Sequence, residues 1–285
     1  MLPSRSLSSL RVVACSALLA ASVIVSAPAA ASANGMTLRG NVLGIGSPTS
    51  FGGADVTWFM SPTQVPLIDP TYFVVDGQPK NGGFEYSFTI DSAPQSGANV
   101  VEVAVNQAGQ QLVALGTPTA AFTKVISQGL DGKSTSASPA VLPAGVVAPL
   151  TSGRRTGSFY TEWLDPINLV LNAVLDQISW TYDGTHVTSF SGGPGLFWDS
   201  QNGWHLTSSP YTGSYYNADH SWATIYTNAS FETGSWFPPT CGTSDTYYYA
   251  NNVYGGPNGQ LSGGVNTWAS SGCLYLLHYW AGTSG

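Results

Sequence analysis

The chain has 285 residues and a formal net charge of −7, with 8% charged and 12% aromatic residues. Few charges together with many aromatic side chains are not the composition of a disordered chain. The acidic excess, with no basic cluster beyond the pair Arg154-Arg155, argues against nucleic acids and anionic lipid surfaces as partners. The length allows two ordinary domains.

Residues 1–33 are typical of a bacterial secretory signal peptide. Arg5 and Arg11 supply the positive start, residues 12–25 supply an apolar run, and Ala31-Ser32-Ala33 supplies the small-residue cleavage motif. The apolar run is shorter than the roughly 20 residues that a membrane-spanning helix needs. We therefore expect cleavage near Ala33 and a secreted, extracellular mature chain that begins near Asn34 and has no membrane span.

A lipoprotein leader is the alternative for this segment, because Val12-Val13-Ala14-Cys15 is similar to a lipidation box. Cys15 lies near the start of the apolar run rather than at its end, which favours cleavage near Ala33. Cleavage also removes two of the eight basic residues, so six basic residues face fifteen acidic ones and the mature net charge becomes about −9.

Residues 34–125 consist of short alternating runs separated by Gly and Pro, which predicts a β-sandwich. In the clearest run, Phe84, Tyr86, Phe88 and Ile90 share one face and the polar residues between them share the other. The predicted strands are 37–43, 55–59, 72–75, 84–90 and 99–105.

The order of these runs also carries a resemblance. A Gly-rich opening strand is followed by Gly52-Gly53-Ala54-Asp55-Val56, then by Asn81-Gly82-Gly83-Phe84-Glu85-Tyr86, and then by a strand of alternating valines. This layout resembles the transthyretin-like and carboxypeptidase-regulatory-like sandwiches of secreted proteins. The resemblance implies a small β-domain without catalytic residues of its own, and other Ig-like and fibronectin-like sandwiches have the same pattern.

Residues 126–153 are rich in Gly, Ser, Pro and Ala and have few large side chains, so we interpret them as a linker. The following part, 154–285, holds eight of the nine Trp, twelve of the fourteen Tyr and all four His residues. We therefore expect an aromatic-rich β-domain here, and we expect any distinctive activity to reside in it.

Two local elements are predicted within 154–285. Asp183-Gly184 stands between two alternating runs, which predicts a β-hairpin closed by a type I′ turn. The apolar residues of 166–178 fit helical spacing after the cap residue Asp165, and they also allow a strand. We prefer a short helix, within a fold that is mainly β.

Cys241 and Cys273 are the two cysteines that remain after cleavage of the leader. An even pair in an oxidising compartment predicts one disulfide. The segments 159–163, 165–168, 178–184 and 271–273 together look like uncharacterised domains of secreted actinobacterial proteins, a resemblance that implies no activity.

The strong catalytic motifs are absent from the sequence: it has no Gly-x-Ser-x-Gly, His-Glu-x-x-His, phosphate loop or Cys-x-x-Cys. We predict no cofactor and no metal. His186, His205 and His220 with Asp219 could form a metal or acid/base site, although scattered histidines are more typical of surfaces and strands. Glu162 and Glu232 could likewise serve as the carboxylate pair of a glycosidase.

The aromatic density supports a different hypothesis. Rings among hydroxyl and amide side chains suit a sugar, because one face of a sugar stacks on a ring while its hydroxyls bond to polar groups. The opposing interpretation is that the rings fill the core. The candidate ligand-binding residues are Trp198, Trp204, Tyr215, Trp222 and Trp236, and the neighbouring Tyr211 and Tyr216 belong to the same set.

Two functions therefore remain open. The first is a non-catalytic extracellular protein that binds a glycan, a cell-wall polymer or a protein, and the second is a secreted hydrolase. The two differ in whether any acid/base residues meet in one pocket. The residues to compare are Glu162, Asp199, Asp219, His220 and Glu232.

Overall fold

The computed structural model describes residues 29–33, 36–40, 42–47, 51, 67–91, 99–118, 152–165, 169–234 and 241–285. These residues form a mainly β structure of two sheets, which confirms the predicted fold class. The helical elements with assigned bounds are two short 3-10 helices, η1 (Ser200–Asn202) and η3 (Leu274–Leu276). No helix in the described ranges is long and apolar enough to cross a membrane.

The first sheet has nine strands in the order β1-β2-β6-β16-β15-β14-β12, with β13 beside β14 and β5 beside β6. Its strands are β1 (Ala29–Ala33), β2 (Met36–Gly40), β5 (Gln78–Lys80), β6 (Gly83–Asp91), β12 (His205–Leu206), β13 (Tyr211–Tyr216), β14 (Ala223–Thr233), β15 (Ser244–Gly255) and β16 (Leu261–Ser270).

The second sheet has eight strands in the order β11-β10-β9-β17-β7-β8-β4-β3. Its strands are β3 (Val42–Ile45), β4 (Leu67–Asp76), β7 (Asn99–Val105), β8 (Gln110–Pro118), β9 (Gly153–Leu164), β10 (Val170–Tyr182), β11 (Val187–Trp198) and β17 (His278–Ser284).

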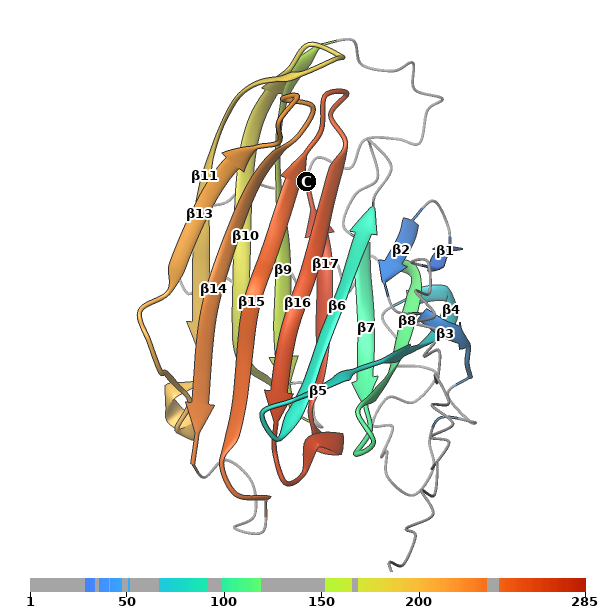
Figure 1. Cartoon of the computed structure of the whole chain (residues 1–285), viewed down its shortest axis with the longest axis vertical. Coiled ribbons are helices and arrows are strands. Elements are labelled where there is room, and N and C mark those ends of the chain that lie inside the picture. Colours follow the sequence, from blue (N-terminus) through green and yellow to red (C-terminus); the bar gives the residue numbers. More distant parts are fainter. Residues whose placement is uncertain are drawn as a thin grey trace, which may run out of the picture.

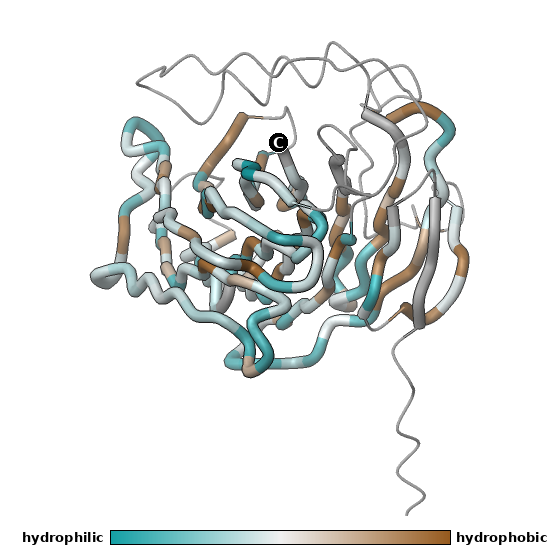
Figure 2. Tube along the Cα trace, turned by 90° about the horizontal axis from the view of Figure 1, so that it is seen from above, coloured by the Kyte–Doolittle hydropathy of each residue, from teal (hydrophilic) through white to brown (hydrophobic). Residues whose placement is uncertain are grey.

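The two sheets lie face to face, with β14–β16 and β6 in one layer and β9–β11 with β17 in the other (Figure 1). The core between them is aromatic: the ring centroids of Trp163 and Tyr279 are 4.7 Å apart, and Phe88 stacks on Tyr279 at 6.2 Å. Burial alternates along much of β6 and β10, and apolar and hydrophilic residues are interspersed through the molecule when it is seen from above (Figure 2). Alternation of this kind gives each sheet one buried face.

The two β-rich parts predicted from the sequence are joined edge to edge within both sheets. Strand β6 pairs with β16 in the first sheet, and β7 pairs with β17 in the second. Of the predicted linker 126–153, residues 126–151 lie outside the described residues. Whatever path that segment takes, backbone hydrogen bonds connect the parts on either side of it.

Four of the five strands predicted in 34–125 are present, as β2–β3, β4, β6 and β7. The predicted strand 55–59 lies outside the described residues. On β6 the predicted faces are confirmed, because Tyr86, Phe88 and Ile90 are buried in the core and Phe84 packs against it.

The preferred helix over 166–178 is wrong, because residues 170–178 belong to strand β10 (Val170–Tyr182). After a register shift between Val170 and Asn172, even-numbered residues of β10, such as Val174 and Ile178, face the opposite sheet. Val170 and Leu175 pack into a second apolar cluster, centred on Tyr160, Leu164 and Trp280, on the outer face. Because both faces of β10 carry apolar residues, the apolar positions coincide with helical spacing.

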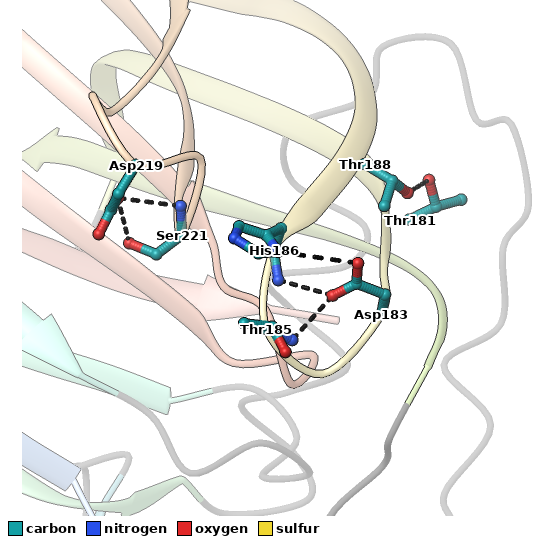
Figure 3. A network of polar contacts seen from close by, with 7 residues as sticks. All are labelled: Thr181, Asp183, Thr185, His186, Thr188, Asp219 and Ser221. Carbon is teal, nitrogen blue, oxygen red and sulfur yellow. Dashed lines mark hydrogen bonds and ion pairs between the residues drawn. The ribbon is translucent and has the colours of Figure 1, made fainter.

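The hairpin β10–β11 is confirmed, but its turn is not type I′. Type I′ requires positive φ at both central residues. Gly184 has φ 92°, whereas Asp183 is not among the non-glycine residues with positive φ in the described part of the chain. The Asp183 carboxylate instead accepts hydrogen bonds from the backbone N–H groups of Thr185 and His186, at 2.8 and 2.7 Å (Figure 3). This side-chain turn occupies residues 183–186.

The predicted disulfide between Cys241 and Cys273 is present. It connects the residues before β15 to the turn that leads from β16 in one sheet to β17 in the other.

Candidate site on the outer face of the nine-stranded sheet

Tyrosines of three adjacent strands share the outer face of the nine-stranded sheet. On β14, Ala223 and Ile225 point into the core, so Thr224 and Tyr226 between them point outward. Tyr215 on β13 lies opposite Thr224, and so does Tyr254 on β15. We call Tyr211, Tyr215, Tyr226 and Tyr254 the tyrosine face.

The rings of the tyrosine face contact one another and remain accessible. Tyr226 lies between Tyr211 and Tyr215, with centroid distances of 5.9 and 6.0 Å. Tyr211 is 59% exposed and Tyr215 48% exposed. The Tyr226 ring lies against Gly213, where a Cβ atom would be only 2.4 Å from it. A glycine at this position therefore lets the ring lie flat on the sheet.

Two phenol groups of the tyrosine face, those of Tyr226 and Tyr254, have raised pKa values. The hydrogen bond from the Tyr226 hydroxyl to the Tyr211 hydroxyl, 3.5 Å long, is the main cause that raises the pKa of Tyr226. Burial, and secondarily the neighbouring Tyr215, raises the pKa of Tyr254 to about 12. These hydroxyls therefore act as neutral hydrogen-bonding groups.

An open groove of about 490 Å³ continues from the tyrosine face toward β2. Rings of Trp222 and Tyr254 form one part of its lining, and polar side chains of β2, β6 and β16 form the other. The lining residues are Arg39, Gly40, Thr89, Asp91, Trp222, Tyr254 and Ser262.

The polar side of the groove is held by one small network. The Arg39 guanidinium donates to the Asp91 carboxylate in an ion pair. The Ser262 hydroxyl donates to Asp91 Oδ1 at 2.8 Å. Because the cation and the anion are paired, this side offers oriented donors and acceptors with no net charge.

The position of Trp222 is fixed by the turn between β13 and β14. The Trp222 backbone N–H donates to Asn217 Oδ1 at 2.8 Å, and the Asn217 N–H donates to the Trp222 carbonyl oxygen at 3.0 Å. The Trp222 ring lies over Gly256, where a Cβ would be 3.1 Å from it. In the same turn, the Asp219 carboxylate accepts from the backbone and hydroxyl of Ser221 (Figure 3).

A second aromatic group on the same outer face is already occupied by internal contacts. The Trp268 indole N–H donates to the Lys80 carbonyl oxygen at 2.7 Å, and the Lys80 ammonium lies 3.6 Å from the centre of the Tyr249 ring. Tyr247 packs on Trp268 at 4.8 Å. These groups satisfy one another, so they serve the sheet rather than a ligand.

The predicted ligand-binding residues are distributed unequally. Tyr215 belongs to the tyrosine face and Trp222 lines the groove, so the structure brings these two together. Trp204 is 1% exposed and belongs to the core. Trp198 is 37% exposed and lies at the end of β11 in the other sheet, and Trp236 lies outside the described residues.

The carboxylate pair Glu162 and Glu232 is not brought together. Glu162 alternates on β9 with Thr161 and Trp163, which face the core, so it lies on the outer face of the eight-stranded sheet. It is 3% exposed, and burial raises its pKa to about 7. Glu232 alternates with the core residue Phe231 on the outer face of the other sheet. The sandwich separates the two carboxylates.

The remaining acid/base candidates are engaged in local structure. Asp199 caps η1 by accepting from the N–H groups of Gln201 and Asn202. His220 stacks on Tyr216 at 4.4 Å, and His205 Nε2 lies 4.0 Å from Glu232 Oε1 at the far end of β14. None of these residues lines the groove. In the described part of the chain, no group of three or more His, Cys, Asp or Glu residues could hold a metal ion.

Several site residues were missed by sequence reasoning. Tyr226 and Tyr254 alternate with core residues, so strand periodicity could have found them. Arg39, Asp91 and Thr89 come from the first third of the chain and reach the groove only because β6 pairs with β16. No local sequence pattern predicts the pairing of β6 with β16.

No family model matches the chain, and no curated protein or solved structure matches it either.

Proposed function

We propose that this chain is a secreted, non-catalytic extracellular protein that binds a glycan or cell-wall polymer through the tyrosine face and the groove. The observation that carries this proposal is the lining of the groove. Rings of Trp222 and Tyr254 stand beside the hydrogen-bonding groups of Thr89, Ser262 and the Arg39–Asp91 pair. A sugar offers the matching surfaces, namely an apolar ring face and a rim of hydroxyls.

The choice of residue type agrees with binding at an open surface. Tyr and Trp supply a large, rigid contact area and lose little side-chain entropy on binding, since each has two side-chain dihedrals. The Tyr254 hydroxyl also remains neutral, as its raised pKa indicates. An uncharged ligand avoids repulsion by the acidic chain as a whole.

Binding is tested on the whole mature chain, because the groove draws residues from both sides of the 126–153 segment. We expect the protein to be retained by at least one of insoluble chitin, cellulose, peptidoglycan or starch in a sedimentation assay. Trp222→Ala removes one wall of the groove and should weaken retention about tenfold, which corresponds to about 1.4 kcal/mol.

Trp198→Ala is the matched control, because it removes a part-exposed Trp from the other sheet. It should leave retention unchanged. Absence of retention by all four polymers would discard the glycan proposal. Equal losses for Trp222→Ala and Trp198→Ala would place the binding elsewhere.

Secretion makes a separate prediction about the N-terminus. Intact protein recovered from the growth medium should begin near Asn34, because Ala31-Ser32-Ala33 is the expected cleavage motif. Cleavage there would remove β1, so that β2, which carries Arg39, becomes the outermost strand of the sheet. N-terminal sequencing and intact mass decide this, and a start at a lipid-modified Cys15 would contradict it.

A further inference from the structure

We infer that the ligand is an extended, uncharged oligosaccharide that lies across the strands, with several consecutive sugar rings bound between the tyrosine face and the Arg39–Asp91 end of the groove. This inference rests on the proposed glycan-binding function and specifies the ligand and its direction on the sheet.

The outer face of the nine-stranded sheet is continuous across six strands. Tyr215, Thr224, Tyr254, Ser262 and Asp91 are consecutive cross-strand partners from β13 to β6. The adjacent row runs from Gly213 through Tyr226, Asn252, Gly264 and Thr89 to Arg39 on β2. This second row crosses six strands, which have five spacings, so it extends over about 24 Å. That length accommodates several sugar rings.

The chemistry of the side chains changes along these two rows. Tyrosine rings occupy the β13–β15 end, and neutral Asn, Thr and Ser side chains follow toward β6. At Gly264, which is buried, three polar groups meet over the backbone: the Tyr254 hydroxyl, the Asn252 amide nitrogen and the Thr89 hydroxyl lie 3.4–3.6 Å from the position that a Cβ would take. A chain of sugars that lies over these groups finds hydrogen-bonding partners between the rings and the ion pair.

The two rows carry no net charge. Arg39 and Asp91 are the charged residues of the two rows, and they neutralise each other. A polyanionic glycan would find one paired cation here and an acidic chain around it. The rows therefore suit a neutral polymer.

The pairing of the strands under the two rows favours a glycan over a peptide. An extended peptide binds a sheet by adding a strand to a free edge. The two rows cross β14, β15, β16 and β6, and each of these strands already has a paired neighbour on both sides. The face consequently offers side chains only, which is the type of surface that a sugar chain uses.

An open groove also predicts how affinity depends on length. A closed pocket can surround most of a small ligand, whereas this groove leaves one side of each sugar in water. Each ring then contributes modestly, and contacts made by linked rings reinforce one another. Affinity should accumulate along the chain instead of being concentrated in one sugar.

The test is isothermal titration calorimetry of the mature protein with three neutral series, cello-, chito- and malto-oligosaccharides, from disaccharide to hexasaccharide. In the series that binds, the hexasaccharide should bind about 100-fold more tightly than the disaccharide. Polygalacturonate serves as the anionic probe and should bind more weakly than the neutral hexasaccharide.

Variants locate the two ends. The loss caused by Tyr226→Ala should grow with ligand length, because the ring lies at the β13–β14 end. Gly264→Leu should weaken binding of the hexasaccharide at least tenfold, since its side chain would displace the polar groups of Tyr254, Asn252 and Thr89 that meet there. Gly193→Leu, on the outer face of the other sheet with no atom near its Cβ position, is the matched control and should have no effect.

The outcomes separate the two proposals. Equal affinity for disaccharide and hexasaccharide, or tighter binding of polygalacturonate, would overturn the extended neutral ligand while leaving glycan binding intact. Absence of binding to every probe by a protein that melts cooperatively would overturn the glycan-binding function as well.

Discussion

The protein should be about 3 kcal/mol more stable at pH 5 than at pH 8, because two buried carboxyl groups hold their protons more tightly in the folded state than in the unfolded chain. Burial raises the pKa of Asp176 from its ordinary value of 3.8 to about 7. Burial likewise raises the pKa of Glu162 from 4.5 to about 7. His278 acts in the opposite direction, since burial lowers its pKa from 6.5 to about 4.

The environment of Asp176 explains why it retains its proton. It lies between the sheets, where the Thr227 hydroxyl donates to Oδ1 at 2.6 Å and the Asn251 amide donates to Oδ2 at 2.9 Å. These bonds lower the pKa, but the loss of hydration outweighs them. A charged carboxylate in the core is costly, so the folded state favours the protonated form of Asp176.

The sign follows from comparing bound protons. Between about pH 4 and 7 the folded protein keeps protons on Asp176 and Glu162 that the unfolded chain has released, so stability falls as the pH rises. Between about pH 4 and 6.5 the unfolded chain protonates His278 and the folded protein does not, so that contribution rises with pH. The two carboxyl groups together outweigh His278, so the net contribution of the three groups to the free energy of unfolding decreases from pH 5 to pH 8.

Single and double variants make the prediction sharp. In Asp176→Asn the difference between pH 5 and pH 8 should shrink to less than about 1 kcal/mol, because Glu162 and His278 then nearly cancel, and urea unfolding at both pH values measures it. In Asp176→Asn/Glu162→Gln it should change sign, because only His278 remains, and the protein should become about 2 kcal/mol more stable at pH 8.

Asp183→Asn is the control for this pH series, because Asp183 is exposed and hydrogen bonds from backbone N–H groups lower its pKa. The Asp183→Asn variant should lose as much stability between pH 5 and pH 8 as the wild type does. A double variant that keeps the wild-type pH dependence would refute the assignment to Asp176 and Glu162.

The sequence predicts this fold best where a strand has one buried face. In β6, alternation of Phe84, Tyr86, Phe88 and Ile90 with polar residues indicated both the strand and its inward side, and both are confirmed. In β10, Val174 is buried on one face and Leu175 is partly buried on the other. The apolar residues therefore do not alternate with polar ones, and they fit helical spacing equally well. Periodicity fails wherever packing buries both faces.

The candidate site is less accessible to sequence reasoning. Aromatic density correctly indicated Tyr215 and Trp222, but density cannot tell an exposed Trp222 from a buried Trp204, since exposure depends on which neighbours the fold supplies. The polar half of the groove was missed altogether. Arg39 and Asp91 reach it through the pairing of β6 with β16, and strand pairing between distant segments leaves no local trace in the sequence.

Removal of the Cys241–Cys273 disulfide should lower the free energy of unfolding by about 4 kcal/mol. The bridge closes a loop with a sequence separation of 32 residues, and a loop of that length restricts the unfolded chain by about this amount. Within the fold the bridge joins the start of β15 to the turn that carries the chain from one sheet to the other. The same turn has further support, because the Gly272 N–H donates to the Cys241 carbonyl oxygen at 3.0 Å.

The measurement is urea unfolding of a Cys241→Ala/Cys273→Ala variant beside the wild type, with and without reductant. The free energy of unfolding of the wild type in reductant should approach that of the variant, and the variant itself should not respond to reductant.

Because Gln107 on the β7–β8 turn also donates to the Gly272 carbonyl oxygen at 3.2 Å, loosening of this turn should be transmitted to β7 and β17. Amide exchange in those two strands should therefore accelerate more than in β13, which lies at the opposite edge of the structure. Equal stability of variant and wild type would show that the hydrogen bonds hold the turn without the disulfide.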